Sequence, residues 1–125
     1  MIIILKHFWH YQWERFPILV LLCTTSAVVL SSAGVQQVSL IDRPFVFAGT
    51  VILIILMLFN MRVADDKRDE NHDNTYHQDR PVQQGIIALT ELILLNRIGI
   101  AAALALLYLL GPTAVAYGIA TLAFC

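Results

Sequence analysis

Charged residues are scarce in this sequence, and those present are concentrated in a few stretches. They make up 14% of the 125 residues, against 58% hydrophobic residues, whereas a soluble domain carries about 25% charged residues. Eight Lys and Arg residues are balanced by nine Asp and Glu residues, so the chain lacks the basic face that binds nucleic acid. The composition therefore predicts an integral membrane protein in contact with the lipid bilayer, and no nucleic-acid partner.

Cysteine is also rare, and the long apolar blocks lack the alternation seen in outer-membrane strands. Cys23 and Cys125 form no spacing pattern and both lie in apolar segments, which indicates lipid- or core-facing residues. Strands of an outer-membrane barrel would alternate polar and apolar residues over about ten positions, and these blocks do not. The predicted fold class is therefore all-α, a polytopic transmembrane helical bundle.

Apolar blocks divide the chain into membrane segments and one long polar loop. We expect three full transmembrane helices, at about 16–35, 44–64 and 90–110. The Asp-rich loop, at 65–85, lies between the second and the third. A fourth block, 113–125, has thirteen residues, which span roughly 20 Å as a helix, whereas the hydrocarbon core is about 30 Å thick. We therefore interpret residues 1–125 as the N-terminal part of a single membrane domain in which the fourth helix is truncated.

Basic residues predict how the chain is oriented. Lys6 and Arg15 precede the first apolar block, and four further basic residues flank the Asp-rich loop, namely Arg62, Lys67, Arg68 and Arg80. The loop between the first two apolar blocks holds only Arg43. The positive-inside rule therefore places the N-terminus and the Asp-rich loop on the cytoplasmic side of the inner membrane. Aromatic residues mixed with charge before Arg15 predict a start at the membrane interface.

The Asp-rich loop has a spacing that can gather carboxylates. Asp66, Asp69 and Asp73 follow D-x-x-D-x-x-x-D, which on a helix confines them to an arc of about 60°, and Asp65 widens the arc to about 100°. Such acids repel one another, so a cation is needed to offset the charge. Hard oxygen ligands favour Mg²⁺ or Ca²⁺, and Mg²⁺ often completes its shell with phosphate oxygens. A solvated acidic loop, balanced by nearby basic residues, is the alternative.

Two other metal sites fit the loop less well. An EF-hand would require Gly at its sixth position, and the sequence has none there, whether the count starts at Asp66 or at Asp69. His72 and His77 are five residues apart with no thiolate nearby, so we interpret them as polar loop residues and not as zinc ligands.

The loop also resembles a known motif. "DDKRDENHD" followed by "RPVQQG" resembles the first Asp-rich motif of the UbiA superfamily of intramembrane prenyltransferases, N-D-x-x-D-x-x-x-D followed by R-P-x-x-x-G. The matching positions are Asp66, Asp69, Asp73, Arg80, Pro81 and Gly85, whereas Asp65 stands where the family usually has Asn. "YQWERFP" is similar to the entrance of the family's first membrane helix, with Arg15 and Pro17 in the matching places.

The resemblance implies Mg²⁺-dependent transfer of a prenyl group from a prenyl diphosphate to an acceptor within the membrane. It implies that Asp66, Asp69 and Asp73 are catalytic Mg²⁺ ligands. Arg80 and Arg15 would contact the diphosphate, and Asp65 would act as a fourth ligand or as an acceptor behind the ligands. Family members also have later helices with a second Asp-rich motif, which is missing here, so we expect this chain alone to be inactive. The alternative is a non-catalytic helical membrane protein with a solvated acidic cytoplasmic loop.

Overall fold

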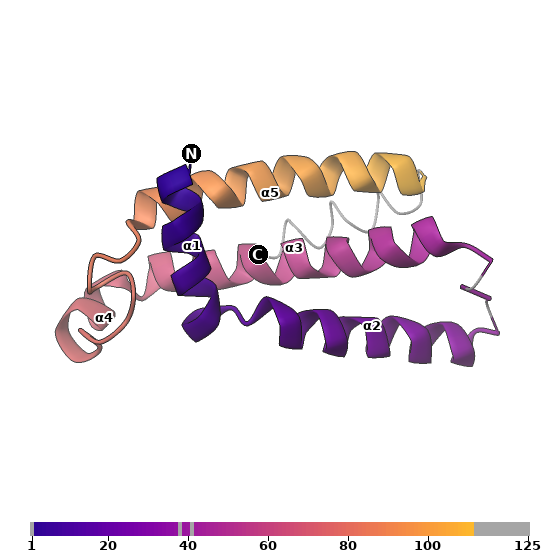
Figure 1. The fold of residues 1–125 in the computed structure, drawn as a ribbon, viewed down its shortest axis with the longest axis horizontal. Coiled ribbons are helices and arrows are strands. Elements are labelled where there is room, and N and C mark those ends of the chain that lie inside the picture. The colour runs from indigo at the N-terminus through magenta and orange to yellow at the C-terminus, as the bar shows by residue number, and fades with distance from the viewer. Residues whose placement is uncertain (1, 38, 41, 112–125) are drawn as a thin grey trace.

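The computed structural model describes residues 2–37, 39–40 and 42–111. Within these residues all regular structure is helical, which confirms the predicted fold class. The five helices are α1 (Ile2–Arg15), α2 (Ile18–Val35), α3 (Pro44–Arg68), α4 (Glu70–Tyr76) and α5 (Leu89–Leu110) (Figure 1). The predicted fourth membrane segment, 113–125, lies outside the described residues.

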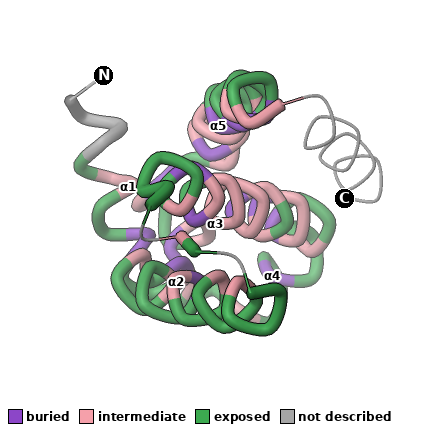
Figure 2. Tube along the Cα trace, turned by 90° about the vertical axis from the view of Figure 1, so that its right-hand side faces the viewer, coloured by how far each residue is buried: buried purple, intermediate pink, exposed green. Residues whose placement is uncertain are grey.

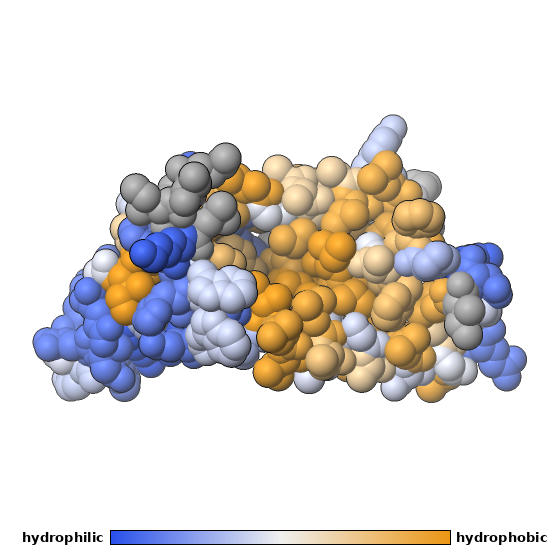
Figure 3. Space-filling model, viewed as in Figure 1, coloured by the Kyte–Doolittle hydropathy of each residue, from blue (hydrophilic) through white to orange (hydrophobic). Residues whose placement is uncertain are grey.

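Three of the helices are long and apolar enough to cross a membrane, as expected. They are α2, α3 and α5, with 18, 25 and 22 residues. At a rise of 1.5 Å per residue these helices are about 27 to 38 Å long, which matches a hydrocarbon core of about 30 Å. Only 6% to 22% of each apolar span is buried inside the structure, so most of its apolar surface is exposed. Figure 3 shows this surface as an apolar band between two polar ends, and we conclude that the chain is embedded in a membrane.

Local sequence explains where these helices begin and end. Pro17 has no backbone N–H and disfavours helix at Phe16, so the chain breaks between α1 and α2. Pro44 occupies the first turn of α3, where a missing N–H costs nothing. At the start of α5, the backbone N–H of Ala88 donates to the Glu91 carboxylate over 3.0 Å, which satisfies one otherwise free donor.

The predicted loop at 65–85 is partly helical. α3 continues four residues past position 64, to Arg68, and α4 covers 70–76. Asp69, with φ −92° and ψ 5°, lies between the two helices and interrupts their regular geometry. In Figure 1, α4 leaves the direction of α3, so residues on either side of Asp69 do not share one straight helical face.

The helices place the loop beside the N-terminal helix. α3 lies between α2 and α5 and packs against both (Figures 1 and 2). α1 crosses this layer steeply near the end that carries α4. Phe59 anchors the crossing, because its ring contacts Phe8 from α1 and Phe16 from the break, with centroids 5.6 and 5.3 Å apart. The core at this end comprises Tyr11, Phe16, Phe59, Val63, Ile87 and Leu92.

Candidate acid and arginine site

The predicted site residues lie at the polar end of the bundle, where α1, α3 and α4 meet. Two predicted site residues, Asp65 and Asp66, lie on α3, and Asp66 is the more buried, with 7% of its surface exposed. Its Oδ1 accepts hydrogen bonds from Arg15 Nη2 at 3.1 Å and Arg62 Nη2 at 2.7 Å, and its Oδ2 accepts one from the Tyr11 hydroxyl at 2.6 Å. A buried carboxylate needs such partners, because desolvation without them is very unfavourable. Asp66 therefore ties α1 to α3.

Tyr11 is the functional residue that the sequence analysis missed. It was treated as one of several interfacial aromatics, but it is fully buried, whereas Trp9 and Trp13 are exposed. Burial first, and then the hydrogen bond to Asp66 and its charge, raise the pKa of Tyr11 far above its usual value. The hydroxyl therefore keeps its proton and remains a donor. Its i,i+4 spacing to Arg15 was the available signal, because both side chains then share one face of α1.

Asp65 and Asp69 are held much more loosely than Asp66. Arg68 donates to Asp65 Oδ1 at 2.9 Å and to Asp69 Oδ1 at 3.3 Å. About half of each carboxylate side chain is exposed, and the Arg68 side chain is 72% exposed. Exposed pairs of this kind contribute little stability. Both carboxylates can therefore exchange Arg68 for another cation at small cost.

Asp73 and Arg80 form the second enclosed pair. Asp73 is 2% exposed, and Arg80 Nη1 donates to its Oδ2. Burial alone would raise the pKa of the Asp73 carboxyl, but the hydrogen bond and the charge of Arg80 outweigh it, so the pKa lies below its usual value. The carboxyl is therefore ionised at neutral pH, and the pair closes α4 onto the segment that follows.

The remaining residues of the R-P-x-x-x-G segment build the turn that presents Arg80. Pro81 is fully buried, and its carbonyl accepts a hydrogen bond from the Ile86 N–H at 2.9 Å. Gly85 has φ +73°, a left-handed conformation that favours glycine. The spacing of this segment therefore has a structural reason that holds whether or not a ligand binds.

The three acids of the motif are not gathered into one cluster. Asp66 pairs with Arg15 and Arg62, Asp69 with Arg68, and Asp73 with Arg80. Within residues 2–37, 39–40 and 42–111, the set whose ligand atoms all lie within 4.8 Å of one another is His72, Asp73 and His77. The interruption of the helix at Asp69 accounts for the separation of the acids, because the 60° arc assumed one continuous helix.

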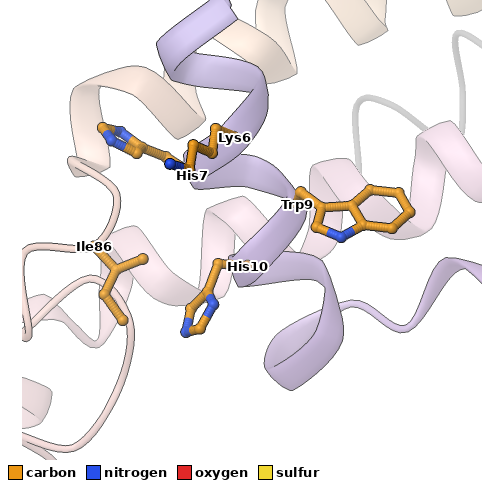
Figure 4. Close-up of a pocket in the computed structure, with 5 residues that line it drawn as sticks. All are labelled: Lys6, His7, Trp9, His10 and Ile86. Carbon is orange, nitrogen blue, oxygen red and sulfur yellow. The ribbon is translucent and has the colours of Figure 1, made fainter.

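Three cavities surround this end of the molecule. One of about 230 Å³ is lined by three charged residues, Arg15, Arg62 and Asp65, and by apolar residues, namely Phe16, Pro17, Leu21, Leu58 and Met61. A second, of about 350 Å³, is almost wholly apolar and runs between α3 and α5; it shares Phe16 with the first. A third, of about 490 Å³, is lined by Lys6, His7, Trp9 and His10 from α1 and by Ile86 from the loop before α5. In Figure 4 the Trp9 ring points away from Ile86.

No family model, curated protein or solved structure matches this chain. The likeness to UbiA prenyltransferases therefore rests on the motif residues and their spacing. What the structure adds is the surroundings of those residues: two enclosed acid–arginine groups, one loose group, and a cavity lined by both charged and apolar side chains.

Proposed function

We propose that this chain supplies the Mg²⁺- and diphosphate-binding part of an intramembrane prenyltransferase, which moves a prenyl group from its diphosphate to an acceptor. The observation that supports this most is the cavity of about 230 Å³. Its arginines suit a diphosphate, because guanidinium groups bind phosphate oxygens in pairs. Its apolar lining residues, which include Leu21 and Leu58, suit the first isoprene units of the chain.

The acids fit a magnesium ion to different degrees. Asp65 and Asp69 fit directly, because a divalent cation can displace the single exposed Arg68 that they share. Asp66 and Asp73 would fit only if their arginines turned toward the diphosphate and the interruption at Asp69, which separates these acids, were rearranged. Mg²⁺ bound by these carboxylates would neutralise charge on the leaving diphosphate as its C–O bond breaks.

The arginines and acids of this chain would then exchange partners when substrate binds. Arg15 and Arg62 now neutralise Asp66, and Arg80 neutralises Asp73. In the proposed complex, these guanidinium groups donate to phosphate oxygens and the carboxylates face the metal. On the positive-inside rule the site faces the cytoplasm from the inner membrane.

The alternative function is a non-catalytic membrane protein, and one observation favours it. Asp66 and Asp73 already have all the hydrogen bonds that a buried carboxylate needs, from Tyr11 and three arginines. In that case the acids fasten α1 and the loop to α3, and their exposed neighbours form a solvated acidic surface. The two functions differ in whether Mg²⁺ and a diphosphate bind together.

The deciding experiment is calorimetric titration of the chain in lipid nanodiscs. Geranyl diphosphate is added with and without Mg²⁺, first to the unchanged chain and then to Asp69→Asn. We expect Mg²⁺-dependent binding that Asp69→Asn weakens by about tenfold or more, equivalent to about 1.4 kcal/mol. Asp79→Asn is the matched control, because Asp79 is exposed, lies in the same loop and forms no ion pair among the described residues.

Two results would reject the prenyltransferase proposal. The first is absence of any Mg²⁺-dependent heat with geranyl diphosphate. The second is an equal loss of affinity in Asp69→Asn and Asp79→Asn, which would mean that only the overall negative charge of the loop matters. In either case the structural role of the acid–arginine groups would stand as the better account.

A further inference from the structure

Two histidines converge on the enclosed carboxylate of α4. His72 precedes Asp73 in α4, and His77 follows the helix. Their ring centroids are 5.6 Å apart, and His72 Nδ1 lies 3.7 Å from Asp73 Oδ1. One ligand atom from each of the three residues lies within 4.8 Å of the other two. Imidazole and carboxylate together form a donor set that suits borderline divalent metals.

The two oxygens of Asp73 have different surroundings. Oδ2 accepts the hydrogen bond from Arg80, whereas Oδ1 is directed to the His72 ring. A carboxylate fixed through one oxygen by a neighbouring group is oriented to coordinate through the other, which is how ligands of protein metal sites are commonly held. Arg80 thus orients the carboxylate and leaves Oδ1 available.

The two imidazoles are also held in place. The His72 ring packs on Tyr76, with centroids 4.8 Å apart. The backbone N–H of His77 donates to the Asp73 carbonyl at 2.9 Å, which fixes the start of the His77 side chain relative to α4. Ligands around a tetrahedral metal with bonds of about 2.0–2.1 Å lie about 3.3 Å apart. The three atoms, which now lie within 4.8 Å of one another, must therefore come closer together to bind one ion.

We propose that His72, Asp73 and His77 bind a divalent transition-metal ion of the zinc type, with water in the remaining position. This site shares Asp73 with the proposed Mg²⁺ site but adds two imidazole ligands, whereas the proposed Mg²⁺ site uses oxygen ligands alone. Zinc bound here joins α4 to the turn after it, and so orders the segment that carries Arg80. It also withdraws Asp73 from a magnesium ion, so zinc and Mg²⁺–diphosphate compete for this carboxylate.

The test is a zinc titration against a chromophoric chelator, with the chain in nanodiscs, a histidine-free affinity tag and no diphosphate present. We expect one Zn²⁺ per chain. His72→Ala and His77→Ala should each weaken zinc binding by more than about 100-fold. Removing a residue that only supports a ligand typically costs about 10–100-fold, and here a ligand itself is removed. His10→Ala is the control, since His10 is an exposed histidine on α1 that pairs with the exposed Glu14. Circular dichroism of each variant checks that the helices are retained.

A second measurement identifies the ligands without any variant. X-ray absorption at the zinc edge should show nitrogen and oxygen neighbours and no sulfur. Sulfur in the first shell would overturn the assignment, because it would place the ion on a cysteine such as the exposed Cys23. Absence of zinc binding, or equal weakening by His10→Ala and His77→Ala, would overturn it as well. Since no diphosphate or Mg²⁺ is present, these outcomes do not depend on the proposed prenyl transfer.

Discussion

The hydrogen bond between Tyr11 and Asp66 gives the sharpest test of how α1 is attached. Tyr11→Phe removes one hydroxyl and keeps the ring that packs in the core. Asp66 Oδ2 then loses the donor at 2.6 Å, whereas Oδ1 keeps both arginines, so the carboxylate stays ionised. A buried hydrogen bond to a charged group contributes about 1.5–3 kcal/mol. We expect the equilibrium constant for release of α1 to rise roughly 10- to 150-fold.

Tryptophan fluorescence during SDS titration in mixed micelles measures this change. The chain has two tryptophans, Trp9 and Trp13, and both lie on α1, so the signal reports the detachment of that helix. Tyr108→Phe is the matched control, because it is the same chemical change at an 81% exposed position on α5. We expect this control to shift the midpoint by much less than Tyr11→Phe.

A double-mutant cycle separates the hydrogen bond from other effects. Asp66→Asn should destabilise α1 by about 3–5 kcal/mol, since it leaves two enclosed arginines without their carboxylate. Tyr11→Phe should then add little in the Asp66→Asn background, because the charged acceptor is already absent. If Tyr11→Phe is no worse than Tyr108→Phe, or is fully additive with Asp66→Asn, the reasoning about α1 is wrong.

Three further changes test the loop and the bundle. Because the pKa of Asp73 is lowered in the folded chain, its pair with Arg80 stabilises the loop fully above the unfolded pKa of about 3.8. This stabilisation is lost as the pH falls through the lower folded pKa. The loop should therefore resist protease at lower pH in the unchanged chain than in Arg80→Gln. Gly85→Ala should destabilise the turn by about 1 kcal/mol at φ +73°, and Gly85→Asn by less, as the midpoints of SDS unfolding would show. Asn96 donates to Asn60 at 2.7 Å between α5 and α3, so Asn96→Leu should cost about 0.6–1.7 kcal/mol in the same assay.

The membrane helices could be predicted because hydropathy is a local property. The start of α3 at Pro44 agrees with the predicted segment, and α2 and α5 begin and end close to the predicted bounds. α3 continues to Arg68, past the predicted end of the membrane segment at 64, because hydropathy marks where the membrane ends and not where the helix ends. Polar residues continue α3 through i,i+3 and i,i+4 pairs, Asp65 with Arg68 and Arg62 with Asp66.

The site was predictable in its residues but not in its pairing. The sequence identified the acids and the basic residues, and their proposed roles toward Mg²⁺ and diphosphate stay predictions. Two of the three partners of Asp66, Arg15 and Tyr11, come from α1, 51 and 55 residues away along the chain, and no local pattern encodes such a contact. The three-residue His72, Asp73 and His77 set was missed because the spacing of the two histidines was considered without the acid between them.

The charges at this end of the molecule predict how ligands would bind. Four carboxylates are paired with four guanidinium groups: Asp65, Asp66, Asp69 and Asp73 with Arg15, Arg62, Arg68 and Arg80. Mg²⁺ alone would add positive charge to a balanced site and must displace arginines that then lack a partner. A diphosphate alone would meet carboxylates that its own charge repels. When Mg²⁺ and a diphosphate bind together, the carboxylates can pair with the metal ion and the displaced arginines can pair with phosphate oxygens.

We therefore expect each ligand to strengthen the binding of the other by at least about fivefold, and by the same factor in both directions, as linkage requires. Calorimetric titrations of geranyl diphosphate at several Mg²⁺ concentrations, and of Mg²⁺ at several geranyl diphosphate concentrations, measure the two factors. Free Mg²⁺–diphosphate association in solution must be subtracted, which the same titration into empty nanodiscs allows. Independent binding of the two ligands would show that the carboxylates and arginines do not exchange partners, and the acid–arginine groups would then be structural.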